Sequence, residues 1–545
     1  MELDPDAKFT LSQAPVYQWM KEEYPSLYAK MLQRIREGRL EPVGALYIEC
    51  DTNLPGGESL VRQLLYGKRF FQKELGADMK VCFLPDVFGY SAALPQLLKL
   101  ADVPYFMTNK LSMNDTNRFP RCTFWWYGLD GSRVLTHMPP ENSYQSAAVP
   151  QMPIYGEVHD NDKDLCPRGL MLYGLGDGGG GPGLEHIERR KRIRDLKGCP
   201  PFEDESVVDF FRRIEKGSEN YRAWHGELYF ERHQGTFTSI AKQKMWNRLL
   251  ENDLHLLEFV AALADCSEAY NYPAAWLKTA WEDVMLFQFH DCLPGSAIRE
   301  VYAETQARYA ALHKEAGQLI REALSALLPP DAEDENVLAV NAAPFPQPLP
   351  KAGAPIPPYG LRLLPEMPQE GPAVPLSAPI LENERLRLVF TERGTLSSLY
   401  DKAAARELLP EGSEGNRLML YPDELTHWDI NKAYLHEKGK PARLLAFRGE
   451  ETDQAKRLYF DYALGDSSRI TQTVELENGS GRADFKTEVD WQEEYQMLRV
   501  QFPADILCSD ASCGIQFGHV KRPTHANTSW DEAKFEVCAQ KWCDM

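Results

Sequence analysis

The order in which local patterns follow one another constrains this chain more than any single motif. In the first part of the sequence, short apolar runs alternate with stretches whose apolar residues recur at helical spacing. We interpret 43–50, 81–85 and 105–109 as strands, and 11–38, 57–75 and 94–101 as helical. This alternation is typical of an α/β layer or (β/α) barrel with a largely parallel sheet. The N-terminal part is therefore predicted to be a barrel-like α/β domain.

A helical bundle is predicted next. Residues 242–264, 274–290 and 299–327 carry apolar side chains three and four apart. Fourteen prolines then fall within 329–379, which is too many for a packed helix.

Beyond residue 380 the pattern becomes that of β structure. Runs such as 385–390, 469–476, 497–502 and 513–520 alternate with period two, as strands of a β-sandwich do. The predicted organisation is an α/β domain at 1–225, a helical middle domain at 226–328, a proline-rich linker with a first β segment at 329–380, and a β-rich domain at 381–545.

Charge and cysteine usage exclude several classes of protein. The 60 basic and 80 acidic residues give a net charge of −20, which argues against binding to nucleic acid or anionic membranes. No apolar run reaches the roughly 18–20 residues of a membrane span. The eleven cysteines form no C-x-x-C pair, and no signal peptide follows Met1, so we expect reduced thiols and a cytoplasmic location. The sequence is compatible with a homo-oligomer but does not indicate one.

Two acidic motifs are candidates for a site. Asp86, in LPDVFGY, ends a predicted strand, and such ends form the active-site face of parallel α/β folds. Taken alone, it fits better a residue that caps the next helix, a common role of Asp. His290 and Asp291 end an apolar helical run, as a metal ligand beside a substrate contact would. The alternative for His290 is a cation at a helix C-terminus.

Two further motifs admit different functions. The run 173–183 contains G-x-G-x-x-G, so a dinucleotide-binding oxidoreductase is an alternative function. Asp177 argues against it, because its negative charge would lie where pyrophosphate binds. The segment 224–239 interleaves aromatic side chains with Glu227 and Glu231, a combination that suits sugar binding, although an ordinary amphipathic element fits too.

Taken in order, these motifs resemble those of the glycoside hydrolase family 38 α-mannosidases, in particular the bacterial and cytosolic-type branch. The similar stretches are ECDTNLPGGESLVRQLLYGKRFF, LPDVFGYSAALPQLLK, TNKLSMNDTNRFP, TFWWYGLDGSRVLTHMPPENSY, YGLGDGGGGP, GELYFERHQGTFTS, KMWNR and QFHDCLPGSAIREVY. They run from about residue 40 to 302, and the sequence beyond 336 resembles the family's β-rich C-terminal region more loosely.

The resemblance implies retaining hydrolysis of α-mannosides in mannose-containing oligosaccharides, at a centre with one Zn²⁺. It implies that Asp86 is the nucleophile and a zinc ligand, and that His290 is a second ligand. Asp291 would contact the mannose hydroxyls, and Lys110 would be a basic substrate contact. Such a nucleophile forms a glycosyl-enzyme that water later hydrolyses.

The motifs support the choice of a general acid/base less strongly than that of the nucleophile. Glu231 is the first choice and Glu227 the second, because a retaining enzyme needs a carboxyl group about 5–5.5 Å from its nucleophile. Asn142 and Tyr144 are expected to line the pocket.

The chain departs from the family at its start. The other two zinc ligands of the family come from a His-x-Asp motif on the first strand, and this sequence has no histidine before His137. We therefore expect a fragment of a longer enzyme that lacks this strand and the C-terminal end, binds zinc weakly and has little or no mannosidase activity. A non-catalytic mannoside-binding remnant is the corresponding alternative.

Overall fold

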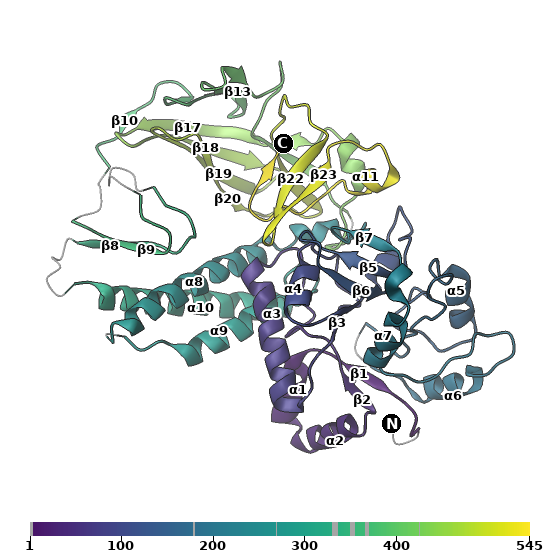
Figure 1. Cartoon of the computed structure of the whole chain (residues 1–545). Helices are drawn as coiled ribbons and strands as arrows, with labels where there is room; N and C mark the ends of the chain where they lie inside the picture. The colour runs from purple at the N-terminus through teal and green to yellow at the C-terminus, as the bar shows by residue number, and fades with distance from the viewer. Residues whose placement is uncertain are drawn as a thin grey trace. The chain divides into compact units, whose positions relative to one another are not determined.

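The computed structural model describes residues 4–177, 180–268, 270–329, 336–348, 355–365, 370–424 and 426–545 (Figure 1). It divides into two compact units. The first comprises Met1–Ala323, His427–Asp429 and Ser509–Met545, and the second comprises Leu324–Thr426 and Ile430–Cys508. Every helix in the described ranges is too short or too polar to cross a membrane.

The first unit contains a five-stranded mixed sheet in the order β3-β4-β6-β5-β7. Its strands are β3 (Val81–Phe83), β4 (Tyr105–Met107), β5 (Thr123–Tyr127), β6 (Arg133–His137) and β7 (Ala223–His225). The pairs β3–β4, β4–β6 and β5–β7 are parallel, whereas β5 is antiparallel to β6. The carboxyl ends of β3, β4 and β6 thus meet at one edge, so the loops that follow them can share a site.

Most of the predicted helices beside this sheet are present. The helix predicted at 57–75 is α3 (Gly57–Phe70) followed by one π-helical turn, and Gly76 ends it in the left-handed region. The helix predicted at 94–101 is α4 (Leu94–Leu100).

The helical stretch predicted at 11–38 is divided in two. It forms α1 (Ala14–Glu23) and α2 (Pro25–Arg36), because Pro25 lacks the N–H that would continue α1 and instead starts α2. The other elements in this part of the chain are β1 (Phe9–Leu11), β2 (Leu40–Pro42), α5 (Gln151–His159), α6 (Leu184–Ile193) and α7 (Val207–Glu215).

The strand predicted at 43–50 is wrong. This apolar segment is buried, but among the described residues it forms only an isolated bridge, between Cys50 and Phe289. Its backbone is instead bonded to neighbouring elements: the N–H of Tyr47 donates to the carbonyl of Gln63 at 2.8 Å, and that of Ile48 to the Gln63 side chain at 3.1 Å. The apolar residues of this segment are therefore explained by its burial and not by pairing with another strand.

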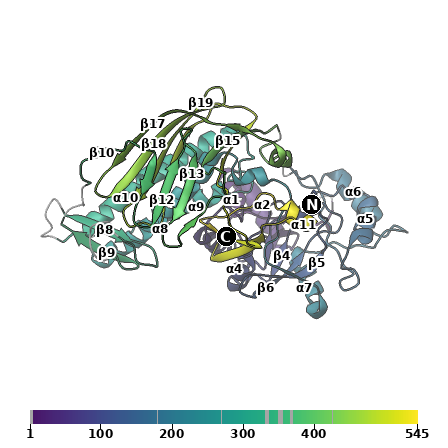
Figure 2. The same ribbon diagram turned by 90° about the horizontal axis from the view of Figure 1, so that it is seen from above.

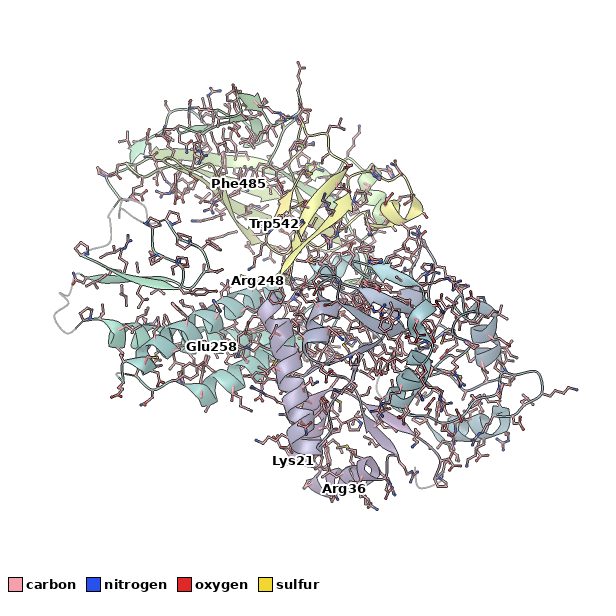
Figure 3. All side chains as sticks on the ribbon, in the orientation of Figure 1. Lys21, Arg36, Arg248, Glu258, Phe485 and Trp542 are labelled. Atoms are coloured by element: carbon pink, nitrogen blue, oxygen red, sulfur yellow. The ribbon has the colours of Figure 1, made fainter. Side chains whose placement is uncertain are left out.

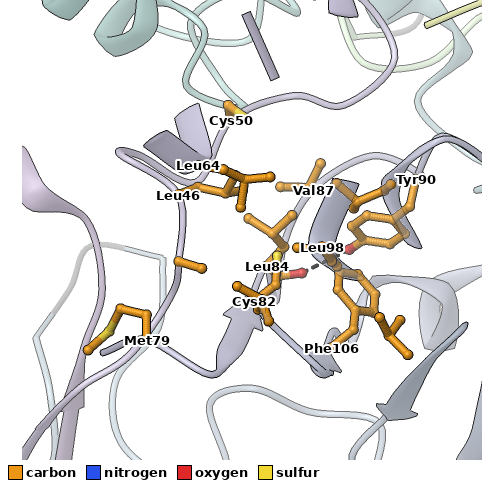
Figure 4. Packing of buried hydrophobic residues seen from close by; sticks show 14 of the residues in the cluster. Leu46, Cys50, Leu64, Met79, Cys82, Leu84, Val87, Tyr90, Leu98 and Phe106 are labelled. Atoms are coloured by element: carbon orange, nitrogen blue, oxygen red, sulfur yellow. Dashed lines mark hydrogen bonds between the residues drawn. The ribbon is translucent and has the colours of Figure 1, made fainter. Parts of the chain in front are cut away.

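An apolar core joins β3 and β4 to α3 and α4. Figure 4 shows Cys82 and Phe106 from the strands, and Leu64 and Leu98 from the helices. Each such side chain that is fully buried stabilises the fold by about 1.5–3 kcal/mol. Within this core, the Tyr90 hydroxyl donates to the carbonyl of Leu84 at 2.9 Å (Figure 4). This bond closes the loop that carries Asp86.

The predicted helical region is confirmed. It consists of α8 (Ala241–Cys266), α9 (Ala274–Phe287) and α10 (Arg299–Leu327). Their inward-facing residues recur at helical spacing, and Leu254, Trp281 and Tyr309 are fully buried.

Residues 509–545, hereafter the C-terminal segment, belong to the first unit. They contain β22 (Asp510–Ile515), β23 (Gly518–Pro523), α11 (Ser529–Ala533) and β24 (Cys543–Asp544). The single strand predicted at 513–520 is a hairpin, because the chain reverses at Gln516–Phe517, where Phe517 has φ +57°. The segment also carries Trp542 (Figure 3). Its side chain covers Gly514 of β22, where an added Cβ would lie 3.0 Å from the indole nitrogen.

The second unit is rich in β structure, as predicted (Figure 2). A five-stranded sheet, β10-β17-β18-β19-β20, shares one apolar core with the strands β11 to β13; Leu388 and Phe460 represent the two sides. The strands of the second unit within the described residues are β8 (Val337–Asn341), β9 (Gly360–Leu364), β10 (Val374–Pro375), β11 (Ile380–Glu382), β12 (Leu386–Phe390), β13 (Leu396–Asp401), β14 (Arg406–Glu407), β15 (Arg417–Pro422), β16 (Lys440–Pro441), β17 (Arg443–Glu451), β18 (Ala455–Leu464), β19 (Ser468–Glu477), β20 (Asp484–Asp490) and β21 (Gln496–Gln501). Parts of the proline-rich stretch lie outside the described residues.

Candidate active site

Asp86 and Lys110 form a close ion pair at the carboxyl ends of β3 and β4. Asp86 Oδ1 lies 2.5 Å from Lys110 Nζ, with 22% of the Asp86 side chain and 6% of the Lys110 side chain exposed. The loop after Asp86 turns at Gly89, which has φ +101° and leaves only 3.3 Å between an added Cβ and the backbone nitrogen of Phe230. Glycine is needed here because the loop combines a left-handed turn with close backbone contact.

His290 reaches the same place from the turn that follows α9. Its backbone N–H and its Nδ1 both bond to the carbonyl of Glu49, at 3.1 and 3.0 Å. With Nδ1 as the donor, Nε2 faces Asp86 Oδ2 at 3.7 Å and Asp291 Oδ2 at 3.8 Å. Residues 86, 110, 290 and 291, which the motifs singled out separately, therefore lie together.

The cations around Asp86 keep it ionised. Burial by itself would raise the pKa of Asp86, but His290 and Lys110 outweigh this effect and lower the pKa to about 2. Burial would likewise lower the pKa of His290, yet the carboxylates of Asp86, Asp291 and Glu49 raise it above its ordinary value. Asp86 is therefore a carboxylate at neutral pH, as a nucleophile has to be.

Aromatic rings enclose this charged group. Lys110 Nζ lies 5.0 Å from the ring centroid of Phe88 and 5.5 Å from that of Phe230. Asp291 is more open: 38% of its side chain is exposed, and its Oδ1 accepts a hydrogen bond from the Ser296 hydroxyl at 2.7 Å. The second oxygen of Asp291 thus remains accessible to a polar ligand.

Tyr144 binds a carboxylate that the sequence did not predict as a site residue. The Tyr144 hydroxyl donates to Asp177 Oδ1 at 2.9 Å. Burial, the charge of Asp86 and the hydrogen bond to Asp177 raise the pKa of Tyr144. Asn142, also predicted to line the pocket, donates to the hydroxyl of Tyr155 at 3.2 Å.

Glu231 is 5% exposed and holds the segment 114–117. Its Oε2 accepts hydrogen bonds from the backbone N–H groups of Thr116 and Asn117, at 3.1 and 2.7 Å. Its Oε1 accepts from the Asn117 side chain at 2.7 Å. Both oxygens of Glu231 are therefore engaged by the segment 114–117.

Glu227, the second choice for the acid/base, is bound to the C-terminal segment. Arg522 donates to both of its oxygens, at 3.2 and 2.8 Å, and Lys534 Nζ lies 3.5 Å away. Burial opposes the charge of Glu227, but these two cations outweigh it and lower its pKa. Neither oxygen of Glu227 is available to a substrate, so its geometry is that of an anchor.

A second group that the sequence did not predict comes from residues 427–429. Asp429 Oδ1 accepts a hydrogen bond from the N–H of His233 at 2.7 Å, and the His233 ring packs edge-on against Phe88 at 4.9 Å. The Trp428 ring lies 6.0 Å from that of His233. No local pattern indicates this contact, which spans almost two hundred residues, although the Trp-Asp pair is of the type that binds sugars.

The donors present are only part of a zinc site. Asp86 and His290 are ligands that zinc accepts, and the bond from Nδ1 of His290 to a carbonyl is the arrangement that orients a metal-binding histidine. Within the described ranges, however, no group of three or more His, Cys, Asp or Glu side chains could hold a metal ion. These residues therefore fit a zinc ion as two of its ligands and do not complete the site.

The glycine run does not have the context of a dinucleotide site. Such a motif has to link a strand to a helix, but Tyr173 forms only an isolated bridge to Ser146. Gly178 and Gly179, the latter being the last glycine of the G-x-G-x-x-G motif, lie outside the described residues.

Comparison with protein families gives three matches along the chain. Residues 1–227 match the glycosyl hydrolases family 38 N-terminal domain, and residues 381–545 match the family's C-terminal domain. Residues 231–327 match the alpha mannosidase middle domain.

Curated relatives align with the whole chain. "Alpha-mannosidase 2C1" of Homo sapiens is 38% identical and "Alpha-mannosidase G" of Dictyostelium discoideum 35% identical, each covering 100% of this chain. The alignments cover 55% and 57% of those proteins, so the chain spans just over half their length. The crystal structure of an alpha-mannosidase from Enterococcus faecalis has a similar fold, with a TM-score of 0.81 at 17% identity over 97% of this chain and 74% of that one.

Proposed function

The chain belongs to glycosyl hydrolase family 38, and from this premise we propose that its site hydrolyses terminal α-D-mannosyl residues of oligosaccharides with retention of configuration. The observation that carries the proposal is the ionised Asp86, held at a strand end by Lys110 and His290. The names of the aligned relatives support mannosides as the substrate class.

Asp86 is the proposed nucleophile. Its Oδ2 faces His290 at 3.7 Å, beyond direct hydrogen-bond distance, while Oδ1 is held by Lys110. Oδ2 would attack the anomeric carbon and displace the aglycone, which yields a mannosyl-aspartate ester that water then hydrolyses.

Asp177 is the proposed acid/base, with Glu231 as the second candidate. The Tyr144 hydroxyl binds Asp177, and the charge of Asp86 is among the causes that raise the pKa of Tyr144, which supports a place for Asp177 near the nucleophile. Asp177 would protonate the leaving oxygen and later deprotonate the attacking water. Glu231 would first have to leave its three donors in the segment 114–117.

The remaining predicted residues would bind the sugar. Oδ2 of Asp291, which does not bind Ser296, would accept hydrogen bonds from sugar hydroxyls. The rings of Phe88 and Phe230 would pack against the C–H faces of the sugar. Lys110 has a second role as well, because its charge stabilises the ionised nucleophile.

We also propose that Asp86 and His290 supply two ligands to a zinc ion. Bound zinc would polarise sugar hydroxyls as a Lewis acid. With only these ligands the affinity of the chain should be weak, in contrast to a closed four-ligand site. Calorimetric titration with Zn²⁺ should show weak binding that His290→Ala abolishes; binding unaffected by His290→Ala would refute the assignment.

The eleven thiols are consistent with a proposed cytoplasmic location. Six of them, Cys50, Cys82, Cys122, Cys166, Cys292 and Cys513, are buried free thiols. Reduced cysteines of this kind are usual where disulfides do not persist.

Covalent trapping tests the proposal. A fluorinated mannosyl fluoride should label the full chain, and peptide mapping should place the added mass on Asp86, because one slow turnover is enough for labelling. Label on another residue, or none together with no release of phenol from an aryl α-mannoside, would overturn the proposal. Binding of mannose without labelling would favour the non-catalytic alternative.

A matched pair of variants identifies the acid/base. Asp177→Asn should slow hydrolysis of alkyl mannosides far more than that of aryl mannosides, whose leaving groups need little protonation. Glu231→Gln should slow both equally, since it disturbs the segment 114–117. The opposite pattern would move the assignment to Glu231.

A further inference from the structure

The C-terminal segment contacts the loops that surround Asp86. It follows the loop 52–55 by more than 450 residues in sequence, yet both lie in the first compact unit. Besides the apolar packing of Cys513 and Val520 with Ala92, the segment makes hydrogen bonds from side chains to loop backbone. Such bonds define where a loop lies more narrowly than apolar packing does.

Gln516, at the tip of the β22–β23 hairpin, makes the central contacts. Its side chain is 2% exposed. The amide nitrogen donates to the carbonyls of Thr52 and Pro55 at 2.9 and 2.8 Å, and the amide oxygen accepts from the Ser91 hydroxyl at 2.6 Å. One carboxamide thus binds the loop 52–55 and the loop that follows Asp86.

The loop 52–55 is in turn hydrogen-bonded to the backbone that follows Asp86. The Asn53 side chain donates to the carbonyl of Phe88 at 3.1 Å, and the Thr52 hydroxyl donates to that of Gly89 at 2.9 Å. Gln540 also binds this loop, by donating to the carbonyls of Asn53 and Pro55 at 2.7 Å each.

The rest of the segment is fixed to the same unit at separate points. Arg522 pairs with Glu227, and the Tyr229 hydroxyl donates to the carbonyl of Glu536 at 2.6 Å. The Ser529 hydroxyl donates to Asn117, which itself binds Glu231. These contacts hold the hairpin in place, so that Gln516 has a fixed base from which to bind the loops.

We infer that Gln516 is a positioning residue for the nucleophile: through its hydrogen bonds to Thr52, Pro55 and Ser91 it fixes the loop that carries Asp86. The inference rests on the proposed function of Asp86, but the loop contacts can be tested without turnover. A displacement of about 1 Å in a reacting group can cost a factor of about 100 in rate. Gln516 would therefore act on the chemical step without touching the substrate.

Hydrogen exchange on the full chain provides the first test. Gln516→Met keeps the side chain's volume and removes its hydrogen bonds, so amides of 52–56 and 87–91 should exchange at least about tenfold faster. Gln516→Glu should have a larger effect, because it turns an oxygen toward two carbonyls. Unchanged exchange in both variants would overturn the inference.

Gln472 provides the matched control. It is 3% exposed and makes three side-chain hydrogen bonds, to Asn416 and Thr487, within the second unit. Gln472→Met should destabilise the protein to a similar extent, yet leave exchange at 52–56 and 87–91 within about twofold of the wild type. Equal acceleration by the Gln472 variant would show a general loss of stability and refute a specific role for Gln516.

Kinetics on an aryl α-mannoside provide the second test. Gln516→Met should lower kcat about tenfold or more, with KM changed less than about threefold, because the nucleophile and not the sugar contacts would be displaced. A higher KM at constant kcat would contradict the inference. An inactive wild-type chain would count against the proposed function, whereas the exchange experiment would still decide the positioning role.

Discussion

Asp86 and Glu227 are two carboxylates of the first unit that differ in one respect. Both are mostly buried, with 22% and 15% of the side chain exposed, and both contact cations that lower their pKa. Arg522 occupies both oxygens of Glu227, whereas Lys110 occupies only one oxygen of Asp86. A buried carboxylate–cation pair is therefore weak evidence for catalysis, and what distinguishes the two is the second oxygen of Asp86, which faces His290 Nε2 at 3.7 Å.

Removal of the charge at each position should separate the two roles most clearly. Asp86→Asn should lower kcat on an aryl α-mannoside by about 10³-fold or more, because the amide cannot act as nucleophile. Glu227→Gln should lower kcat by less than about tenfold per folded molecule. The comparison fails if the Glu227 variant loses as much activity as the Asp86 variant while it remains folded by circular dichroism.

Stability should show the largest effect at Glu227. Glu227→Ala leaves the buried Arg522 without its partner, so the free energy of unfolding should fall by about 3–5 kcal/mol, as for other broken buried pairs. Urea denaturation measures this change. The double variant Glu227→Leu with Arg522→Met should recover part of it; a loss below about 1 kcal/mol for Glu227→Ala would contradict the role of anchor.

The anchor should also weaken in acid. Burial opposes ionisation of Glu227, but Arg522 and Lys534 bring its folded pKa below the ordinary 4.5. Its contribution is therefore present above about pH 4.5 and is lost as the pH falls through the folded pKa. The difference in the free energy of unfolding between wild type and Glu227→Gln, measured in urea at pH 7, 5, 4 and 3, should shrink only below about pH 4.5. A difference that stays constant down to pH 3 would show that the pair contributes no charge-dependent stability.

An exposed pair should have the smallest effect. Lys21 on α1 lies 2.6 Å from Glu74, but its side chain is 53% exposed (Figure 3). Glu74→Gln should change the free energy of unfolding by less than about 0.5 kcal/mol, because solvent screens the charges. A larger loss would mean that distance rather than burial decides the strength of these pairs.

The sequence allowed the layers of the fold and half of the site to be predicted. Periodicity identified α3, α8 and α9, and a strand end identified Asp86, because these features depend on residues close together in the chain. Lys110 was predicted from the family resemblance alone. The segment 43–50 was misinterpreted, since an apolar run indicates burial and cannot show whether another strand lies beside it.

The partners of the site residues could not be predicted in the same way. Asp177 faces the site through the hydroxyl of Tyr144, and Asp429 reaches His233 from nearly two hundred residues away. Glu227 and Glu231 have similar local sequence contexts and were separated only by what binds them: Arg522 in one case and Asn117 in the other. Such differences arise from tertiary contacts that leave no periodic signal.

The contact of Gln516 with the loop 52–55 has a consequence for synthesis. It joins residues 464 positions apart, and ribosomes add roughly 5–20 residues per second. The loops around Asp86 therefore emerge roughly 25–90 s before the hairpin that fixes them. During that interval the nascent α/β domain can collapse on its local contacts, but its nucleophile loop lacks a fixed position. Maturation of the site is thus expected to be a late step of folding, after the domain core has formed.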